Sequence, residues 1–523
     1  MNWPHWTVVP VVLPLIAGAT CLLLERRAPN VVRAVSLGTT VALLGVALHL
    51  AGVAASGTVH SYLLGNWKAP FGIALALDRL SALMLVLTAV VAIGSALYAR
   101  GGGARGPHDA RGLHYHALFQ FQLMGLNGAF LTADLFNLFV FFEVLLIASY
   151  GLLLHGGGAA RLKAAIHYVG FNLTGSALFL VAVALLYGIT GTLNMADLSQ
   201  RVAALGPDQA ALVRAAALLL IVVFGVKAAL LPLYFWLPDT YRAAPAPVAA
   251  LFAIMTKVGV YCVARVTTLI FGDGAGVAAG IADAWLAWLA IGTLALAALG
   301  TLAAVRLRTL VSYLVIASAG TLLLAIGLGS AATLSAALFY LVNSTLVAAA
   351  LFLLVDSIAS GRGEADDAMF PAPLAYRAAY GALFFVFALE AAGLPPMGGF
   401  IGKALLLRAS TDQPLMVATW AALLVSGLGM MVAVARAGST VFWKAVDANR
   451  MQSAAARPTR AERIAIGWLT ITMLGVVANA GAMMRYAEAT AAQLLDRRAY
   501  VGAVLGAQPE PPAWTPRAGM TKP

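Results

Sequence analysis

Four titratable side chains interrupt long apolar runs of this sequence: Glu143, Lys227, Lys257 and Lys403. If a helix starts near Asp134, Glu143 lies about 13 Å along it, and a helix through Lys257 would bury that ammonium group about 16 Å deep. Charged groups at such depths in a bilayer are costly, so they usually face a polar interior and mark ion or proton pathways. These residue types and their placement therefore favour proton transfer.

Structural roles are the alternative for the same residues. Glu143 would then be a permanently protonated acid, hydrogen-bonded between helices. Lys227 would extend along its aliphatic stem to the membrane surface. Arg265 stays charged at any accessible pH, so we expect it to fix packing or the outer field and not to carry protons.

Prolines beside two of the lysines predict broken helices. Pro232 follows Lys227, and Pro395 and Pro396 precede Lys403. A proline cannot donate the helical hydrogen bond and clashes with the preceding turn. Backbone groups freed beside a buried ammonium group are a common transporter device for binding ions or water. Lys227 lies on the seventh predicted span and Lys403 on the twelfth. Because an odd number of spans reverses the direction of the chain across the membrane, we expect two structural repeats of inverted topology.

Further polar residues lie near these lysines. Glu390 would either end a proton path or hydrogen-bond structurally. His167 would either feed protons inward or only anchor its helix at the interface. The other polar side chains are neutral groups that can hold water but not take a charge: Tyr340, Asn343, Ser344 and Thr345.

The composition places the chain in a membrane. Of 523 residues, 62% are hydrophobic and 10% are charged, whereas soluble domains are about half apolar and about a quarter charged. The two cysteines, Cys21 and Cys262, lie in apolar runs, so we expect no disulfide framework, no thiolate metal site and no cofactor. Apolar windows predict an all-α polytopic membrane protein with about fourteen transmembrane helices. The windows are 7–24, 31–54, 78–99, 114–131, 134–154, 164–189, 211–236, 246–271, 281–304, 309–328, 333–355, 376–409, 415–441 and 463–484.

Lysine and arginine predict the orientation. Those outside the spans concentrate in alternate loops, such as the loops that hold Arg26, Arg161 and Arg306, and positive loops face the cytoplasm. Both termini are then periplasmic. The net charge of +12 follows from this topology, so nucleic acid is not an expected partner. We expect the segment between Lys444 and Arg463 to lie along the cytoplasmic face and the Pro-rich end, 508–523, to be disordered.

Five motifs together resemble a known family. They are Leu131-Thr-Ala-Asp-Leu-Phe-Asn-Leu-Phe-Val-Phe-Phe-Glu143, Lys227 and Pro232 followed by Phe235-Trp-Leu-Pro-Asp239, Ala244-Pro-Ala-Pro247, Thr256-Lys-Val-Gly-Val-Tyr261, and Gly393-Leu-Pro-Pro-Met-Gly-Gly-Phe-Ile-Gly-Lys403. The chain resembles the antiporter-like subunits of respiratory complex I and of the Mrp antiporters. Around the glutamate it is most similar to the D subunits of the Mrp-type (Mnh/Pha) multisubunit monovalent cation/proton antiporters.

The resemblance implies a domain division and a set of proton-carrying residues. Two inverted five-helix repeats would occupy 111–272 and 273–445. The other parts would be helices one to three in 1–110, a cytoplasmic amphipathic segment and helix fourteen in 446–485, and a partly disordered tail in 486–523. The proton-carrying residues would be a Glu–Lys pair, a central lysine and a terminal lysine: Glu143, Lys227, Lys257 and Lys403.

Span eleven departs from the family pattern. Relatives usually have a histidine and often a lysine there, where this chain has Asn343 and Ala348. We expect water held by Tyr340, Asn343 and Thr345 to bridge the gap between the central and the terminal lysine.

The function implied is that of a secondary transporter subunit and not of an enzyme. It would use the proton-motive force to export Na+ or K+, beside other membrane subunits of the same complex in the lipid bilayer of a bacterial inner membrane. One alternative is an antiporter-like proton-pumping subunit of a complex I-type NADH:quinone oxidoreductase or of a membrane-bound hydrogenase. A passive scaffold is the other.

Overall fold

The computed structural model describes residues 4–102, 108, 112–444 and 458–509, and most of them are helical. Most of the segment expected along the cytoplasmic face (445–457) and most of the expected disordered end (510–523) lie outside the described residues.

Long apolar helices form most of the chain. The first half contains α1 (Val9–Leu24), α2 (Pro29–Ala54), α3 (Arg79–Ala99), α4 (Tyr115–Leu131), α5 (Leu135–Leu154), α6 (Ala159–Thr190), α7 (Met195–Ala203), α8 (Ala210–Ala228), α9 (Trp236–Ala243) and α10 (Ala246–Leu269). The second half contains α11 (Asp283–Ala303), α12 (Leu307–Gly327), α13 (Ala331–Arg362), α14 (Arg377–Ala392), α15 (Gly398–Ala409), α16 (Met416–Gly438), α17 (Arg460–Ala478), α18 (Ala480–Leu495) and α19 (Arg497–Leu505). Short single turns are η1 (Pro4–Thr7), η2 (Leu64–Asn66), η5 (Pro207–Gln209), η6 (Gly276–Ala278), η7 (Gly363–Ala365) and the π-turn η8 (Ser439–Trp443).

The predicted spans fall on these helices, and the polytopic helical class is confirmed. Among the described residues, eleven helices are long and apolar enough to cross a membrane. The remaining predicted spans correspond to α1, to α4 and to the pair α14–α15, which are shorter. The total of fourteen therefore stays a prediction.

Side-chain caps fix where several of the helices start. Asp78 accepts from Ser81 N–H in a capping box before α3, Asp134 accepts from Asn137 N–H before α5, and Ser330 accepts from Thr333 N–H before α13. Each cap satisfies a backbone donor that the first helical turn leaves unpaired, which matters most in an apolar environment.

A small hairpin precedes α3 and was not predicted. Strands β1 (His60–Leu63) and β2 (Ala74–Leu77) pair antiparallel, with His60 opposite Leu77 and Leu63 opposite Ala74. Strands this short have no room for a clear alternation of polar and apolar residues, so the all-α expectation missed them.

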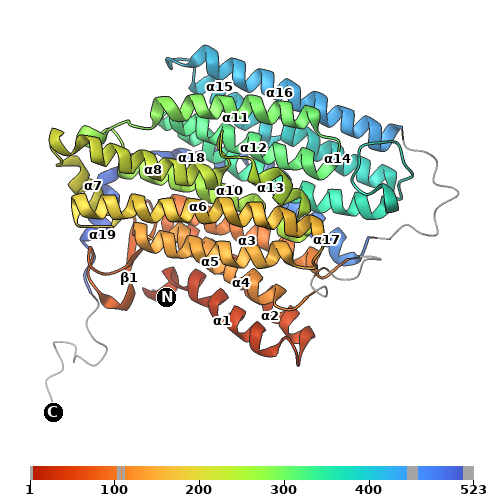
Figure 1. Cartoon of the computed structure of the whole chain (residues 1–523), viewed down its shortest axis with the longest axis horizontal. Helices are drawn as coiled ribbons and strands as arrows, with labels where there is room; N and C mark the ends of the chain where they lie inside the picture. The colour runs from red at the N-terminus through yellow and green to blue at the C-terminus, as the bar shows by residue number, and fades with distance from the viewer. Residues whose placement is uncertain (1–3, 103–107, 109–111, 445–457, 510–523) are drawn as a thin grey trace.

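The helices follow one another across the bundle in roughly chain order (Figure 1), from α1 and α2 at one edge to α15 and α16 at the other. Neighbouring helices in this row pack as α5 on α6, α6 on α8, α8 on α10, α10 on α12 and α13, and α13 on α15. The most apolar windows of α10 and α13 are completely buried. These two helices form the core, and the candidate site crosses them.

Two halves of the bundle repeat the same order of elements. A pair of packed helices (α4 with α5, α11 with α12) comes first, then a 32-residue helix (α6, α13), and then a broken helix (α8–α9, α14–α15). This order supports the expected five-helix repeats. Their inversion and the domain boundaries stay predictions.

The C-terminal helices close over the start of α3. Tyr486 Oη donates to Arg79 O at 2.9 Å, and Gln493 Oε1 accepts from Arg79 N–H at 2.9 Å. On α19, Tyr500 lies over the guanidinium group of Arg265, 5.2 Å from its ring centroid. The last predicted helix therefore extends beyond 484, to Leu495 after a kink at Asn479.

Candidate functional site

Glu143 lies half-buried on α5 and faces α6, where Ser176 Oγ donates a short hydrogen bond to its carboxylate. Val140 and Ile147, one turn to either side on α5, are 39% and 63% exposed. Glu143 is therefore at the edge of an outward apolar face, between the bundle interior and its surroundings.

Lys227 lies in the last turn of α8 and is 5% exposed. Its Nζ donates a 2.9 Å hydrogen bond to Asn172 Oδ1 on α6, and a Cβ on Gly175 would come within 3.9 Å of the same nitrogen. Asn172 and Ser176 are one turn apart on α6. Among the described residues, no ion pair within 4.0 Å joins Lys227 to Glu143. Each charged group instead bonds to a neutral side chain of α6.

The backbone breaks directly after Lys227. Ala229 adopts a left-handed conformation (φ 57°), which is rare for residues other than glycine, and Pro232 lies between α8 and α9. Leu231 N–H donates to Thr293 Oγ1 on α11 at 2.9 Å. A neighbouring helix thus satisfies a backbone group of the break, which fixes the end of α8 and with it Lys227.

Lys257 is completely buried in the middle of α10. Its Nζ donates a 2.5 Å hydrogen bond to Ser318 Oγ on α12, and that hydroxyl donates to Val315 O at 2.7 Å. Two residues later, a Cβ on Gly259 would lie 2.5 Å from Ala228 N. Glycine therefore lets α10 approach the end of α8, close to Lys227.

Ser318 also lines a small cavity that continues toward the second break. The cavity holds about 20 Å³, which exceeds the roughly 10–15 Å³ that a single water needs. Its polar lining comes from α12, α13 and α14: Ser318, Tyr340, Ser344 and Glu390, with Ala348 beside them. The cavity therefore has room for about one water molecule between Ser318, the partner of Lys257, and the carboxylate of Glu390.

Glu390 and Lys403 both bind the backbone of the break between α14 and α15. Glu390 Oε2 accepts from Gly398 N–H at 2.9 Å, and Lys403 Nζ donates to Ala392 O at 2.9 Å. Gly393, in the left-handed region at φ 79°, lies against the lysine chain, because a Cβ there would be 2.8 Å from Lys403 Cδ. The break therefore folds the lysine back toward the carboxylate. A continuous helix would separate the two residues by close to 20 Å.

Two buried oxygens near this break have no hydrogen-bond donor among the described residues: Glu390 Oε1 and Asn343 Oδ1. Asn343 Oδ1 would lie 2.3 Å from a Cβ on Gly398, so it faces the start of α15. Buried acceptors usually have a partner, and water in the adjoining cavity is a suitable donor.

The expected accessory residues do not all join this arrangement. Tyr340 lines the cavity, whereas the Thr345 hydroxyl donates to Leu341 O at 2.6 Å within its own helix. His167 is exposed on α6. It therefore lies outside the row of contacts that leads from Glu143 to Lys403.

A separate buried ion pair lies toward one end of α10. Arg265 Nη1 is 2.6 Å from Asp78 Oδ2, with both side chains at most 5% exposed, and its guanidinium group lies 5.3 Å from the Tyr261 ring centroid. This pair joins α10 to the start of α3, which supports the packing role expected for Arg265.

Sequence reasoning missed the neutral partners of the charged residues: Asn172, Ser176, Thr293 and Ser318. A single serine or threonine in a membrane helix commonly bonds to its own backbone, so these residues gave no signal by themselves. Asn172 was the one that could have been found, because an amide is uncommon in an apolar span and this one lies more than two turns inside the predicted span 164–189.

Comparisons with known proteins identify the family of the chain. Residues 132–429 match the family described as "NADH:quinone oxidoreductase/Mrp antiporter, TM". Two similar relatives are D subunits of cation/proton antiporters. The one from Rhizobium meliloti (strain 1021), of a probable K(+)/H(+) antiporter, is 40% identical over 98% of both chains. The one from Bacillus subtilis (strain 168), of an Na(+)/H(+) antiporter, is 35% identical over 76% of this chain and 79% of the relative.

The fold is also similar to a solved structure, that of the Mrp complex from Dietzia sp. DQ12-45-1b. The similarity has a TM-score of 0.83 at 25% identity and covers 96% of this chain and 99% of the other. Since the family match spans more than half of the chain and one relative at 40% identity aligns over nearly all of it, this multi-pass membrane protein belongs to the NADH:quinone oxidoreductase/Mrp antiporter transmembrane family.

Proposed function

We propose that this chain is the proton-translocating subunit of a multisubunit Na+ or K+/proton antiporter, in which it uses the proton-motive force for cation export. One observation carries the proposal: Glu143, Lys227, Lys257 and Lys403 follow one another across the bundle from α5 to α15, and each has a polar partner on a neighbouring helix or at a helix break. The names of its relatives, which are antiporter subunits for K+ or Na+, support the substrate class.

The row gives each proton carrier a neutral neighbour. Glu143 and Lys227 bind adjacent turns of α6 through Ser176 and Asn172. Loss of a proton by Lys227 removes a positive charge from the environment of Lys257 and so favours the charged form of Lys257. Proton occupancy of one lysine thereby controls the proton affinity of the next.

Beyond Lys257 the path runs through Ser318 and the small cavity to Glu390. A hydroxyl and a water can each accept and donate a proton, so the absent span-eleven histidine and lysine are not needed as carriers. Lys403, bonded across the break, is the terminal carrier.

The energy comes from the membrane potential and the proton gradient. Each proton that crosses a 100 mV potential releases about 2.3 kcal/mol, which a suitable stoichiometry couples to cation export. We place the chain in a bacterial inner membrane with both termini periplasmic, beside other membrane subunits of its complex.

Antiport in everted vesicles tests this function. The vesicles contain the complete complex, and dequenching of a pH-sensitive dye is followed after addition of Na+ or K+. Lys257→Ala and Glu143→Ala should abolish exchange while the chain remains in the membrane at normal abundance. Lys163→Ala, an exposed lysine of α6, is the matched control and should exchange normally. Exchange that survives joint neutralisation of Glu143, Lys227 and Lys257 would show instead that the chain is a passive scaffold.

The second candidate function is the same proton path inside a redox-driven complex, because the matching family includes NADH:quinone oxidoreductase subunits. The vesicle assay separates the two functions. An antiporter exchanges cations for protons when only an ion gradient is imposed, whereas a redox-driven pump needs an oxidisable substrate.

A further inference from the structure

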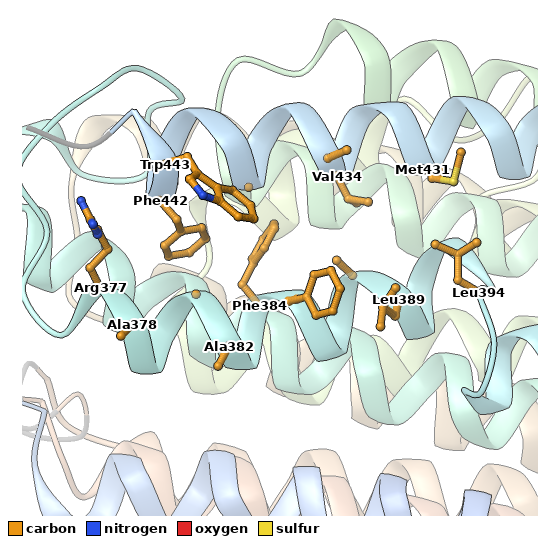
Figure 2. Close-up of a pocket in the computed structure, with 15 residues that line it drawn as sticks. Arg377, Ala378, Ala382, Phe384, Leu389, Leu394, Met431, Val434, Phe442 and Trp443 are labelled. Carbon is orange, nitrogen blue, oxygen red and sulfur yellow. The ribbon is translucent and has the colours of Figure 1, made fainter.

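A groove of about 600 Å³ runs between α14 and α16 at the outer edge of the bundle (Figure 2). It opens to the outside and lies apart from the Glu143-to-Lys403 row of contacts, except that its inner end approaches the α14–α15 break at Leu394. Its walls are almost entirely apolar, and among the described residues Arg377 is its one charged lining residue.

The groove is about one membrane leaflet deep. The lining residues of α14 run from Arg377 to Leu389, which are about 18 Å apart along the helix, and half of a ~30 Å hydrocarbon core is ~15 Å. Figure 2 shows Arg377 at one end and Leu394 and Met431 at the other. The groove therefore runs from one membrane surface to near the bilayer centre.

The surface end of the groove carries positive charge and aromatic rings. Arg377 is exposed and is the first residue of α14, whose free N–H groups and helix dipole also favour an anion. Trp443 is 80% exposed beside it, and exposed Lys444 follows. Tryptophan and basic side chains at this level are typical of the layer where lipid headgroups lie.

Small residues make the floor of the groove. A Cβ on Gly381 would touch the Phe442 ring at 3.5 Å, and a Cβ on Gly438 would touch Phe384 at the same distance. The two phenylalanine rings meet at 5.3 Å between centroids. Glycine at both positions lets the two aromatic rings lie directly against the helix backbones, so no side chain at these two positions extends into the groove.

We propose that the groove binds an anionic glycerophospholipid, with an acyl chain between α14 and α16 and its phosphate at Arg377. A transmembrane helix of a neighbouring subunit is the competing occupant, but it would need a contact surface along the full ~30 Å of the membrane. A groove that ends near mid-bilayer and has its charge at the surface matches a lipid better. This binding site lies beyond the proposed transport path and does not depend on it.

Native mass spectrometry of the purified full chain tests the site. Delipidated protein is incubated in detergent micelles that contain phosphatidylglycerol or phosphatidylcholine with identical acyl chains, and bound lipid is counted. The variants are Arg377→Gln, which removes the surface charge, and Ala382→Phe, which fills the groove. The matched controls are Arg463→Gln, an exposed arginine of α17, and Ala379→Phe, an exposed alanine on another face of α14.

The wild type should retain phosphatidylglycerol in preference to phosphatidylcholine. Arg377→Gln should reduce that preference about fivefold, the contribution of one basic side chain near an anionic headgroup. Ala382→Phe should reduce binding of both lipids, and both controls should resemble the wild type. Unchanged lipid binding in Arg377→Gln and Ala382→Phe would overturn the proposal. It would also be overturned if Ala382→Phe left lipid binding intact and instead released the other subunits from the complex.

Discussion

Lys257 and Ser318 are joined by a 2.5 Å hydrogen bond between α10 and α12, the only hydrogen bond of this ammonium group that the described residues show. The same hydroxyl lines the cavity that reaches Glu390. Ser318 therefore both stabilises a buried cation and connects it with the second half of the bundle.

Ser318→Ala should lower cation/proton exchange by roughly tenfold or more, because an unsatisfied buried donor costs about 1–3 kcal/mol. Dye-based exchange in everted vesicles measures the effect, and Ser318→Thr should restore it. Ser312→Ala is the matched control, since Ser312 is also a buried α12 serine but bonds only to Arg308 O. Equal activity in the two alanine variants would contradict a role for Ser318 in the path.

Asn172→Leu should impair exchange by removing the partner of the Lys227 ammonium group. Leucine has the same branched arrangement of heavy atoms as asparagine but no hydrogen-bond acceptor, so the charged form of Lys227 would lose a stabilising partner. The pH dependence of exchange is the measurement, and its optimum should move to lower pH. Thr174→Ala, an exposed α6 residue bonded to Gly170 O, should keep the wild-type profile. A profile that stays fixed in Asn172→Leu would mean that Lys227 does not titrate during transport.

Glu390→Gln should distinguish the structural role of Glu390 from a role in proton transfer. The amide can still accept from Gly398 N–H, so thermal unfolding should change little, but it cannot take up a proton. Exchange should fall at least tenfold. Wild-type exchange in this variant would assign Glu390 a purely structural role, the alternative left open by the sequence.

Asp78→Asn should destabilise the fold by about 3–5 kcal/mol, because it leaves the Arg265 guanidinium group buried without its anion. Asp78→Asn/Arg265→Gln, which removes both charges, should be less harmful. Thermal unfolding in detergent provides both values. A double variant no more stable than Asp78→Asn would show that the ion pair is not what holds α10 to α3.

The same pair predicts a pH dependence. Burial alone would raise the pKa of Asp78, but the Arg265 charge and hydrogen bonds from Arg265 and Ser81 lower it below its ordinary value. A lowered folded-state pKa contributes stability that is fully present above the ordinary Asp pKa of about 4. That stability is lost as the pH falls through the lowered pKa. The difference in Tm between wild type and Asp78→Asn should therefore shrink only in strongly acidic buffer.

Most of the scaffold follows from apolar run length and from proline. Each predicted span falls on a helix because about twenty apolar residues have few other stable conformations in a membrane. The breaks near Pro232 and Pro395 were predictable for the same reason, since proline removes a helical hydrogen bond. The β1–β2 hairpin and α7 were not, because both are short and lie between the long helices.

The charged members of the site could be predicted, but their contacts could not. Glu143 and Lys227 stand out in an apolar sequence, yet only the packing of α5 and α8 on α6 shows that Ser176 and Asn172 are their partners. The approach of Lys403 to Glu390 likewise depends on how the break folds back. Such contacts arise from tertiary structure, and spacing along one chain does not encode them directly.

The C-terminal helices have a practical consequence for protein engineering. Tyr486, Gln493 and Tyr500 attach α18 and α19 to the start of α3 and to Arg265. A purification tag or fluorescent reporter is therefore best fused after Leu505, where it leaves these attachments intact. The sequence alone would end the last span at 484. A chain shortened to that residue would lose all three of these contacts with α3 and Arg265.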